Sequence, residues 1–133
     1  MPRLTTTTLA LAATLAIGLP ASAVAQDSPF AVDQALAGRG KTVWSKNGCA
    51  GCHGFGKKMA GPDLAGVHER RSLDWLRRWL KDTKAMLESD SLARVLLAES
   101  KGAKMPQFKL TDADVDALVH YMAQETAKRA AGK

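Results

Sequence analysis

The stretch Cys49-Ala50-Gly51-Cys52-His53 decides how the rest of this sequence is interpreted. A C-x-x-C-H run is typical of c-type haem attachment, because two thiols spaced by two residues can add to the two vinyl groups of one porphyrin. The next residue, His53, then lies under the iron, where its imidazole can serve as the proximal ligand. The motif therefore predicts one covalent haem c, attached through Cys49 and Cys52, with His53 bound to its iron.

Two other chemistries use closely spaced cysteines. A thioredoxin-like redox pair normally follows a strand in a βαβ unit, and this sequence shows no such alternation of strands and helices. A zinc site needs four ligands, so the two cysteines would have to recruit two of His53, His68 and His120, whose spacing fits no zinc pattern. Both alternatives are therefore weaker than haem attachment.

Residues 1–25 have the pattern of an export signal. Arg3 supplies a positive start, residues 9–19 are almost entirely apolar, and Ala23 and Ala25 form an A-x-A cleavage pattern. A membrane anchor needs roughly twenty apolar residues, about twice the length of this run. We therefore expect cleavage after Ala25, a periplasmic location, and no stable membrane insertion. Export agrees with a c-type haem, which is attached outside the cytoplasm.

The helical signals predict one small all-α domain at residues 33–127, between a flexible leader at 26–32 and a disordered tail at 128–133. Asp33 can cap a first helix that ends at Asn47-Gly48, and Ser72 can cap a second helix. A polar interval at 84–89 precedes a short helix bearing Leu92, Val95 and Leu96 and closed by Gly102. Residues 111–114 resemble a capping box for the last helix, which we expect to fray after Gln124. No strand-like alternation is evident, so helices and loops should wrap around the haem.

The second iron ligand decides between an electron carrier and a reactive centre. Met105 is the leading candidate, because Lys104-Met105-Pro106 is a non-helical turn in which a loop can present the thioether. Met59 and Met86 are the alternatives, whereas Met122 lies on an apolar helix stripe where core packing is the usual role. His68 and His120 are weaker candidates, and His120 is expected to be solvated.

The region from Leu36 to Gln124 resembles the class I monohaem cytochrome c family. Gly40 and Trp44 match a glycine and an aromatic residue on the family's first helix, and Tyr121 matches the aromatic residue that crosses at that glycine. Residues 61–64, Gly-Pro-Asp-Leu, resemble the family's G-P-x-L stretch. The resemblance implies the small cytochrome c fold and a hydrogen bond from the His53 imidazole to the Pro62 carbonyl, which would improve the ring as a donor to iron.

The stretch from Gly61 to Asp82, which contains the segments 61–67 and 70–80, is also similar to monohaem cytochromes and cytochrome domains that accompany denitrification copper enzymes. It is less closely similar to the small cytochrome of thiosulfate-oxidising complexes. In the second of these segments, Trp75 or Trp79 could donate an indole N–H to a haem propionate, and plain core packing is at least as reasonable for either residue.

Composition and charge limit the partners. The 133 residues include 19 Lys and Arg against 13 Asp and Glu, a formal net charge of +6. Scattered basic residues and few aromatic ones argue against nucleic-acid binding, and an acidic surface on a redox protein is the expected counterpart of a monomer. Two basic segments flank the motif and the Met105 loop: Arg39, Lys41, Lys46, Lys57 and Lys58 in one, and Lys101, Lys104 and Lys109 in the other.

These observations predict a periplasmic electron-transfer protein, not an enzyme, that delivers single electrons to or from a terminal reductase or oxidase through a His/Met-ligated haem c. Two alternatives remain open. The chain could be the cytochrome subunit of a larger redox enzyme, or a haem enzyme or gas sensor with an open distal site. The last would need distal hydrogen-bond donors, and no dedicated set of them is apparent.

Overall fold

A computed structural model describes residues 30–132 of the chain. The expected export signal at 1–25 and the first part of the expected leader lie outside the described residues. Within the described part, all regular structure is helical, as expected. None of the described helices has both the length and the apolar character that crossing a bilayer requires.

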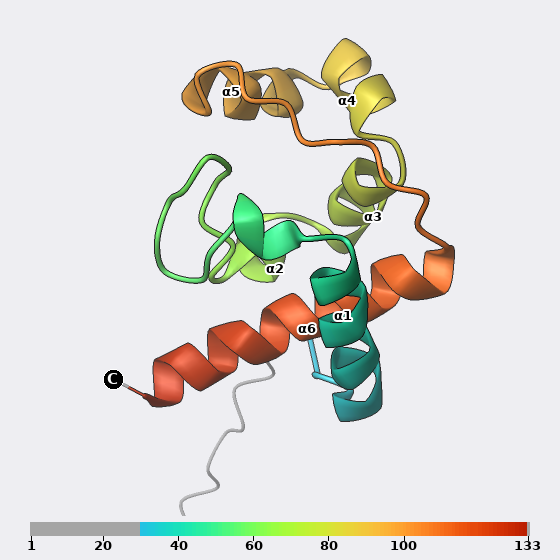
Figure 1. The fold of residues 1–133 in the computed structure, drawn as a ribbon, viewed down its shortest axis with the longest axis vertical. Helices are drawn as coiled ribbons and strands as arrows, with labels where there is room; N and C mark the ends of the chain where they lie inside the picture. Colours follow the sequence, from blue (N-terminus) through green and yellow to red (C-terminus); the bar gives the residue numbers. More distant parts are fainter. Residues whose placement is uncertain (1–29, 133) are drawn as a thin grey trace, which may run out of the picture.

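Six α-helices and one short 3₁₀ helix, η1, make up the regular structure of the described part (Figure 1). In chain order they are α1 (Gln34–Lys46), η1 (Cys49–Gly51), α2 (Val67–Arg70), α3 (Leu73–Lys81), α4 (Thr83–Ser89), α5 (Ser91–Glu99) and α6 (Asp112–Ala131). Local side chains begin these helices where the sequence predicts. Asp33 accepts a hydrogen bond from the Leu36 N–H, and Ser72 accepts one from the Trp75 N–H. Thr111 and Asp114 form the complete capping box of α6.

The first and last helices cross closely at a glycine (Figure 1). A Cβ atom added at Gly40 would lie 2.0 Å from the Ala117 carbonyl oxygen and 2.7 Å from the Tyr121 Cβ. Only a residue without a side chain therefore allows this approach of α1 to α6. Beside the crossing, Val43, Trp44, Leu118 and Tyr121 form one of two buried clusters. The crossing of Gly40 and Tyr121 agrees with the expectation from the resemblance.

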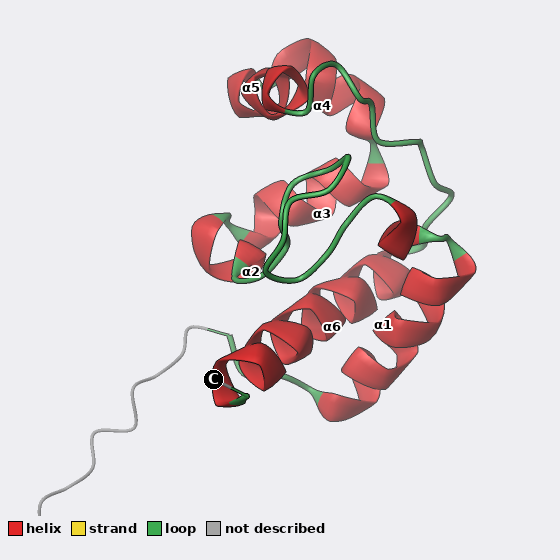
Figure 2. Cartoon of the chain, turned by 60° about the vertical axis from the view of Figure 1, so that its left-hand side comes forward, coloured by secondary structure: helices red, strands yellow, loops and turns green. Residues whose placement is uncertain are grey.

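The second buried cluster joins α6 to the middle of the chain. Helix α3 lies between the pair α4 and α5 at one end of the molecule and the pair α1 and α6 at the other (Figure 2). Leu76 on α3, Met86 on α4 and Met122 on α6 are among its members, each less than 5% exposed. This arrangement holds α4 and α5 away from α6, and the candidate site lies between them.

The expectation of a polar interval at 84–89 is wrong, because these residues belong to α4. Asp82 caps this helix by accepting a hydrogen bond from the Ala85 N–H at 2.9 Å. Met86 and Leu87 then face the core, and the exposed Lys84, Glu88 and Ser89 made the segment look like a loop. Val95, expected on an apolar face of α5, is 51% exposed.

The chain ends also differ from the expectation. Helix α6 continues through residues 128–131, which were expected to be a disordered tail beyond fraying at Gln124. Alanines, the 2.8 Å ion pair between Lys128 and Glu125, and basic side chains in the last turn all favour helix there. At the other end Phe30, assigned to the flexible leader, packs against the rings of His68 and His120.

Candidate cofactor site

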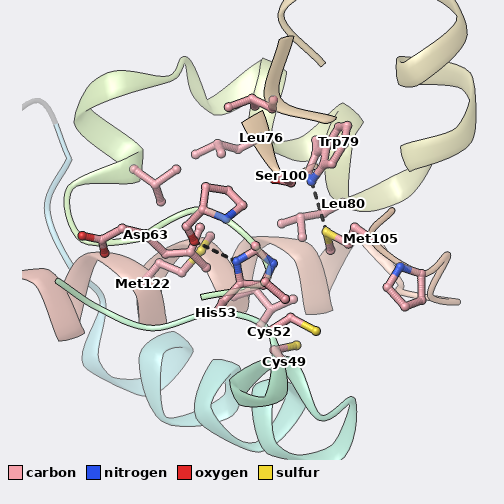
Figure 3. Close-up of a pocket in the computed structure, with 18 of the residues that line it drawn as sticks. Cys49, Cys52, His53, Asp63, Leu76, Trp79, Leu80, Ser100, Met105 and Met122 are labelled. Atoms are coloured by element: carbon pink, nitrogen blue, oxygen red, sulfur yellow. Dashed lines mark hydrogen bonds between the residues drawn. The ribbon is translucent and has the colours of Figure 1, made fainter. Parts of the chain in front are cut away.

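The C-x-x-C-H motif lies in a tight turn directly after α1. Gly48 adopts a left-handed conformation with φ of 65°, which lets the chain reverse after the end of α1. The Cys52 and His53 N–H groups both donate to the Cys49 carbonyl, at 3.2 and 3.0 Å. This turn brings Cys49, Cys52 and His53 together (Figure 3). Burial raises the pKa of the Cys49 thiol above its ordinary value, so the free thiol is largely protonated at neutral pH.

The orientation of the His53 ring is set by residues 61 and 62. Its Nδ1 atom lies 3.0 Å from the Pro62 carbonyl oxygen, the contact that the resemblance implies. Because a carbonyl only accepts hydrogen bonds, Nδ1 carries the proton and Nε2 is left free to donate its lone pair to a metal. Gly61 packs against the ring, since a Cβ there would lie 2.4 Å from the His53 Cε1. The Gly61 N–H also donates to the Cys52 carbonyl at 2.8 Å, which fixes this loop against the motif.

A cavity of about 290 Å³ opens beside these residues. Cys49, Cys52 and His53 line it on one side, and Met105 lies across it from His53 (Figure 3). Its remaining walls are mostly apolar and come from α3, α4, α5 and α6, through Leu76, Leu80, Leu87, Leu96, Leu118 and Met122 among others. Arg70, Arg71 and Lys104 add positive charge to the lining.

The placement of the methionines separates the ligand candidates. Met105 lines the cavity, whereas neither Met59 nor Met86 does. Met86 is 3% exposed and lies on α4 within the core cluster that also contains Leu76 and Met122. The expected polar interval around Met86 is therefore part of a helix with a buried face. Met122 lines the cavity from α6 and is 4% exposed. The geometry therefore favours Met105 over the two alternatives.

The histidines outside the motif have other surroundings. His120 is partly buried, contrary to the expectation that it is solvated. The centroid of the Phe30 ring lies 4.6 Å from that of the His120 ring, and the His120 Nδ1 accepts a hydrogen bond from the Asp33 N–H at 3.0 Å. The His68 side chain is 6% exposed, and burial lowers its pKa, so its ring is neutral at neutral pH. Within the described residues, no group of three or more His, Cys, Asp and Glu side chains is arranged to hold a metal ion.

Both tryptophans of α3 use their indole N–H groups within the protein. Trp75 donates to the Asp90 carboxylate at 3.2 Å, and Trp79 donates to the Met105 sulfur at 3.2 Å. Neither bond follows from the sequence, which suggested a haem propionate as the acceptor for one of these indoles. The partners are 15 and 26 residues away along the chain, so no local spacing pattern marks them.

The residues that line the cavity fit a covalently bound haem c. Two thiols with the required spacing and an imidazole whose Nδ1 is already bonded lie on one side, and a thioether lies on the other. The apolar walls suit a flat macrocycle, and the arginine and lysine side chains suit its carboxylates. The chemistry of this donor set also matches haem iron better than zinc, since a thioether is a known haem ligand.

Comparisons with known proteins point the same way. A family model described as cytochrome c matches residues 37–126. A nitric oxide reductase subunit from Stutzerimonas stutzeri is 35% identical over 92 residues, which cover 63% of this chain and 54% of that protein. The chain thus spans about half the length of this curated relative.

Solved structures share the fold. The cytochrome c from Rhodothermus marinus superposes with a TM-score of 0.69 at 23% identity, over 74% of this chain and 83% of that one. A cytochrome c domain from Pseudomonas putida reaches a TM-score of 0.58 at 38% identity, over 67% of this chain and 89% of that one.

Proposed function

Because this chain belongs to the cytochrome c family, we propose that it is a one-electron carrier with a single haem c attached to Cys49 and Cys52 and ligated by His53 and Met105. The observation that carries the proposal is the position of Met105, whose thioether lies across the cavity from the His53 imidazole (Figure 3). If His53 and Met105 both hold the iron, the protein would leave no position on it for a substrate.

Haem c, when bound, supplies one iron that exchanges a single electron between two oxidation states. The protein then has to keep both ligands in place in both states. The hydrogen bond from His53 to the Pro62 carbonyl and the close packing of Gly61 hold the imidazole on one side. A thioether as the second ligand raises the reduction potential, which suits delivery of electrons to a terminal reductase or oxidase.

The basic residues near the cavity support an acidic docking partner. Lys104 lines the cavity, and Lys58 donates to the Glu99 carbonyl at 2.9 Å, so the loop after the motif meets the end of α5. This contact brings Lys58 close to Lys101, the start of the second basic segment. Lys41 and Lys46 lie on α1, and Arg39 on the same helix forms an ion pair with Asp114 at 3.0 Å. Complementary charge would mainly accelerate encounter with the partner.

A second candidate is the electron-entry subunit of a larger redox enzyme. It is favoured by the similarity to a protein named as a subunit of nitric oxide reductase. The chemistry at the haem would be the same in both cases, and only the lifetime of the complex with the partner would differ. Size-exclusion chromatography of the protein from its native source distinguishes a monomeric carrier from a subunit that elutes with an enzyme.

The proposal places the carrier in the periplasm after cleavage behind Ala25. The sequence of residues 1–25 supports export, and c-type haems are attached outside the cytoplasm. The intact mass of periplasmic material should equal that of a chain beginning at Gln26 plus one haem. Full-length chain recovered from membranes would contradict this processing.

Absorption spectra test the ligation directly. The ferric protein should be low spin and show the weak far-red band of sulfur-to-iron charge transfer, and the ferrous protein should not bind carbon monoxide. Met105→Ala should abolish the band, admit carbon monoxide and lower the potential. Met59→Ala is the matched control, because Met59 lies outside the cavity. Carbon monoxide binding by the wild-type protein would instead support an open distal site and a haem enzyme or gas sensor.

A further inference from the structure

We propose that Trp79, Trp75 and Asp90 form a positioning chain that holds the Met105 sulfur in one orientation toward the iron and tunes its strength as a donor. The proposal rests on Met105 being an iron ligand. It adds a role for three residues that lie on α3 and at the start of α5, none of which would touch the iron.

The first link is the hydrogen bond between Trp79 and the ligand. The Trp79 Nε1 lies 3.2 Å from the Met105 Sδ (Figure 3), across 26 residues of sequence. A thioether sulfur has two lone pairs and is a weak acceptor. If the indole N–H occupies one lone pair, the other is the one available to a metal. The bond therefore selects which lone pair of Met105 faces the cavity.

The second link is the stack of the two indoles on α3. The rings of Trp75 and Trp79 have centroids 5.5 Å apart and lie within 8° of parallel. Residues four apart on a helix are neighbours on one face, so α3 itself brings the rings together. Trp75 is 9% exposed and packs in the cluster with Leu76 and Met86. The position of the Trp79 ring is therefore limited by a buried partner.

The third link is the Asp90 carboxylate, which uses its two oxygens for two tasks. Oδ1 accepts a hydrogen bond from the Ala93 N–H at 2.9 Å and caps α5. Oδ2 accepts one from the Trp75 Nε1 at 3.2 Å. These bonds lower the pKa of Asp90, the Ala93 N–H first among them, so the carboxylate is ionised at neutral pH. Asp90 thus ties the Trp75 ring to the first turn of α5.

Two consequences follow for the ligand. An N–H donor on sulfur withdraws electron density, which weakens donation to the oxidised iron more than to the reduced iron and raises the reduction potential. Hydrogen bonding near the metal is an established means of tuning a haem potential. A fixed sulfur orientation also gives one sharp sulfur-to-iron band. Loss of the positioning chain should therefore lower the reduction potential and shift or broaden the sulfur-to-iron band.

The experiment uses the complete haem protein and measures the reduction potential and the far-red band. Trp79→Phe keeps an aromatic ring in the stack and removes the N–H, so it should lower the potential and shift the band. Asp90→Asn keeps a good N-cap for α5 but replaces one acceptor oxygen with an amide nitrogen. This variant should change the reduction potential and the far-red band in the same direction as Trp79→Phe, and by a smaller amount.

The matched control is Asp82→Asn. Asp82 caps α4 as Asp90 caps α5, through a 2.9 Å bond to the Ala85 N–H, and it makes no bond to an indole. This variant should leave the potential and the band unchanged. The combination Asp90→Asn with Trp79→Phe should behave like Trp79→Phe alone, because residues that act through one another are not additive. In the Asp90→Asn variant the side-chain amide could rotate so that its oxygen still accepts the hydrogen bond from the Trp75 Nε1. Asp90→Ser then replaces it, because serine also caps a helix and has only one side-chain oxygen.

The outcomes separate this inference from the proposed function. If Met105→Ala leaves the far-red band intact, Met105 is not the ligand and both proposals fail. If Met105→Ala removes the band but Trp79→Phe changes neither band nor potential, the positioning chain alone is wrong. An additive double variant, or an equal shift in Asp82→Asn, would show that Asp90 acts only on helix stability. If the Trp79→Phe variant does not fold, Trp75→Phe tests the positioning chain at its third link, because it keeps the ring stack and removes the N–H that donates to Asp90. It should then lower the reduction potential, and an unchanged potential would overturn the proposal.

Discussion

Replacing Gly40 with alanine tests the crossing of α1 and α6, on which the position of the haem motif depends. The new Cβ would lie 2.0 Å from the Ala117 carbonyl oxygen, and ordinary van der Waals contact begins near 3.4 Å. The helices would have to separate by about 1.4 Å, the difference between these values. The obstacle is backbone, so a change of rotamer cannot relieve it.

The expected magnitude follows from two opposing effects. Overpacking of a tight core contact costs up to about 3 kcal/mol. Alanine is a better helix former than glycine by roughly 1 kcal/mol, which offsets part of that cost. We therefore expect Gly40→Ala to lower the free energy of unfolding by about 2 kcal/mol. For a domain of this size, such a loss corresponds to a fall in Tm of roughly 10 °C.

Gly38→Ala is the matched control on the same helix, because a Cβ there meets no atom within 4 Å. Because alanine is a better helix former than glycine and its Cβ meets no obstacle at this position, Gly38→Ala should raise the free energy of unfolding by up to about 1 kcal/mol. Guanidinium unfolding of the haem protein, followed by far-ultraviolet circular dichroism, measures both variants. Equal stabilities for Gly40→Ala and Gly38→Ala would refute the close crossing.

Two further predictions concern charge. Hydrogen bonds from the Thr111 hydroxyl and N–H and from Arg39 lower the pKa of Asp114 from 3.8 to about 2. A carboxyl group with a lowered pKa stabilises the folded state above its ordinary pKa, and this stabilisation is lost as the pH falls through the pKa of the folded state. Asp114→Asn should therefore be less stable than wild type at pH 6, and the difference in the free energy of unfolding should close between about pH 4 and pH 2. A difference that stays constant over this pH range would contradict the prediction. Bimolecular electron transfer to an acidic acceptor should slow with added salt, because the Debye length falls to roughly 10 Å at 0.1 M salt. The rate should depend less steeply on salt in a Lys57→Glu, Lys104→Glu double variant. Equal salt dependence of the two proteins in stopped-flow measurements would show that these basic residues have no docking role.

Local sequence patterns predicted much of the fold. The caps at Asp33, Ser72 and Thr111 were predictable because each side chain bonds an N–H group only three residues away. The cysteines and histidine of the motif are equally local, and their spacing predicts haem attachment. Helix α4 was missed for the opposite reason: it is short, its exposed face is polar, and burial of Met86 depends on contacts from other helices.

Family resemblance supplied contacts that spacing alone could not. It led to the expectation that Gly40 meets the helix bearing Tyr121 and that Pro62 accepts a hydrogen bond from His53, and both contacts are present. It did not supply the acceptors of the two indoles on α3. A propionate was a reasonable acceptor for Trp75 or Trp79, yet the chain itself provides an acceptor for each.

The sequence by itself determined the helical class of this protein and predicted its covalent haem chemistry, because thiol spacing, capping residues and helical periodicity act over a few neighbouring positions. Only the tertiary structure shows that the alternatives Met59 and Met86 lie outside the cavity that Met105 and His53 line, and that Trp79 reaches the Met105 sulfur from 26 residues away. Contacts of this kind depend on how separate helices pack. That packing is set by shape and burial summed over the whole core, which no short stretch of sequence contains.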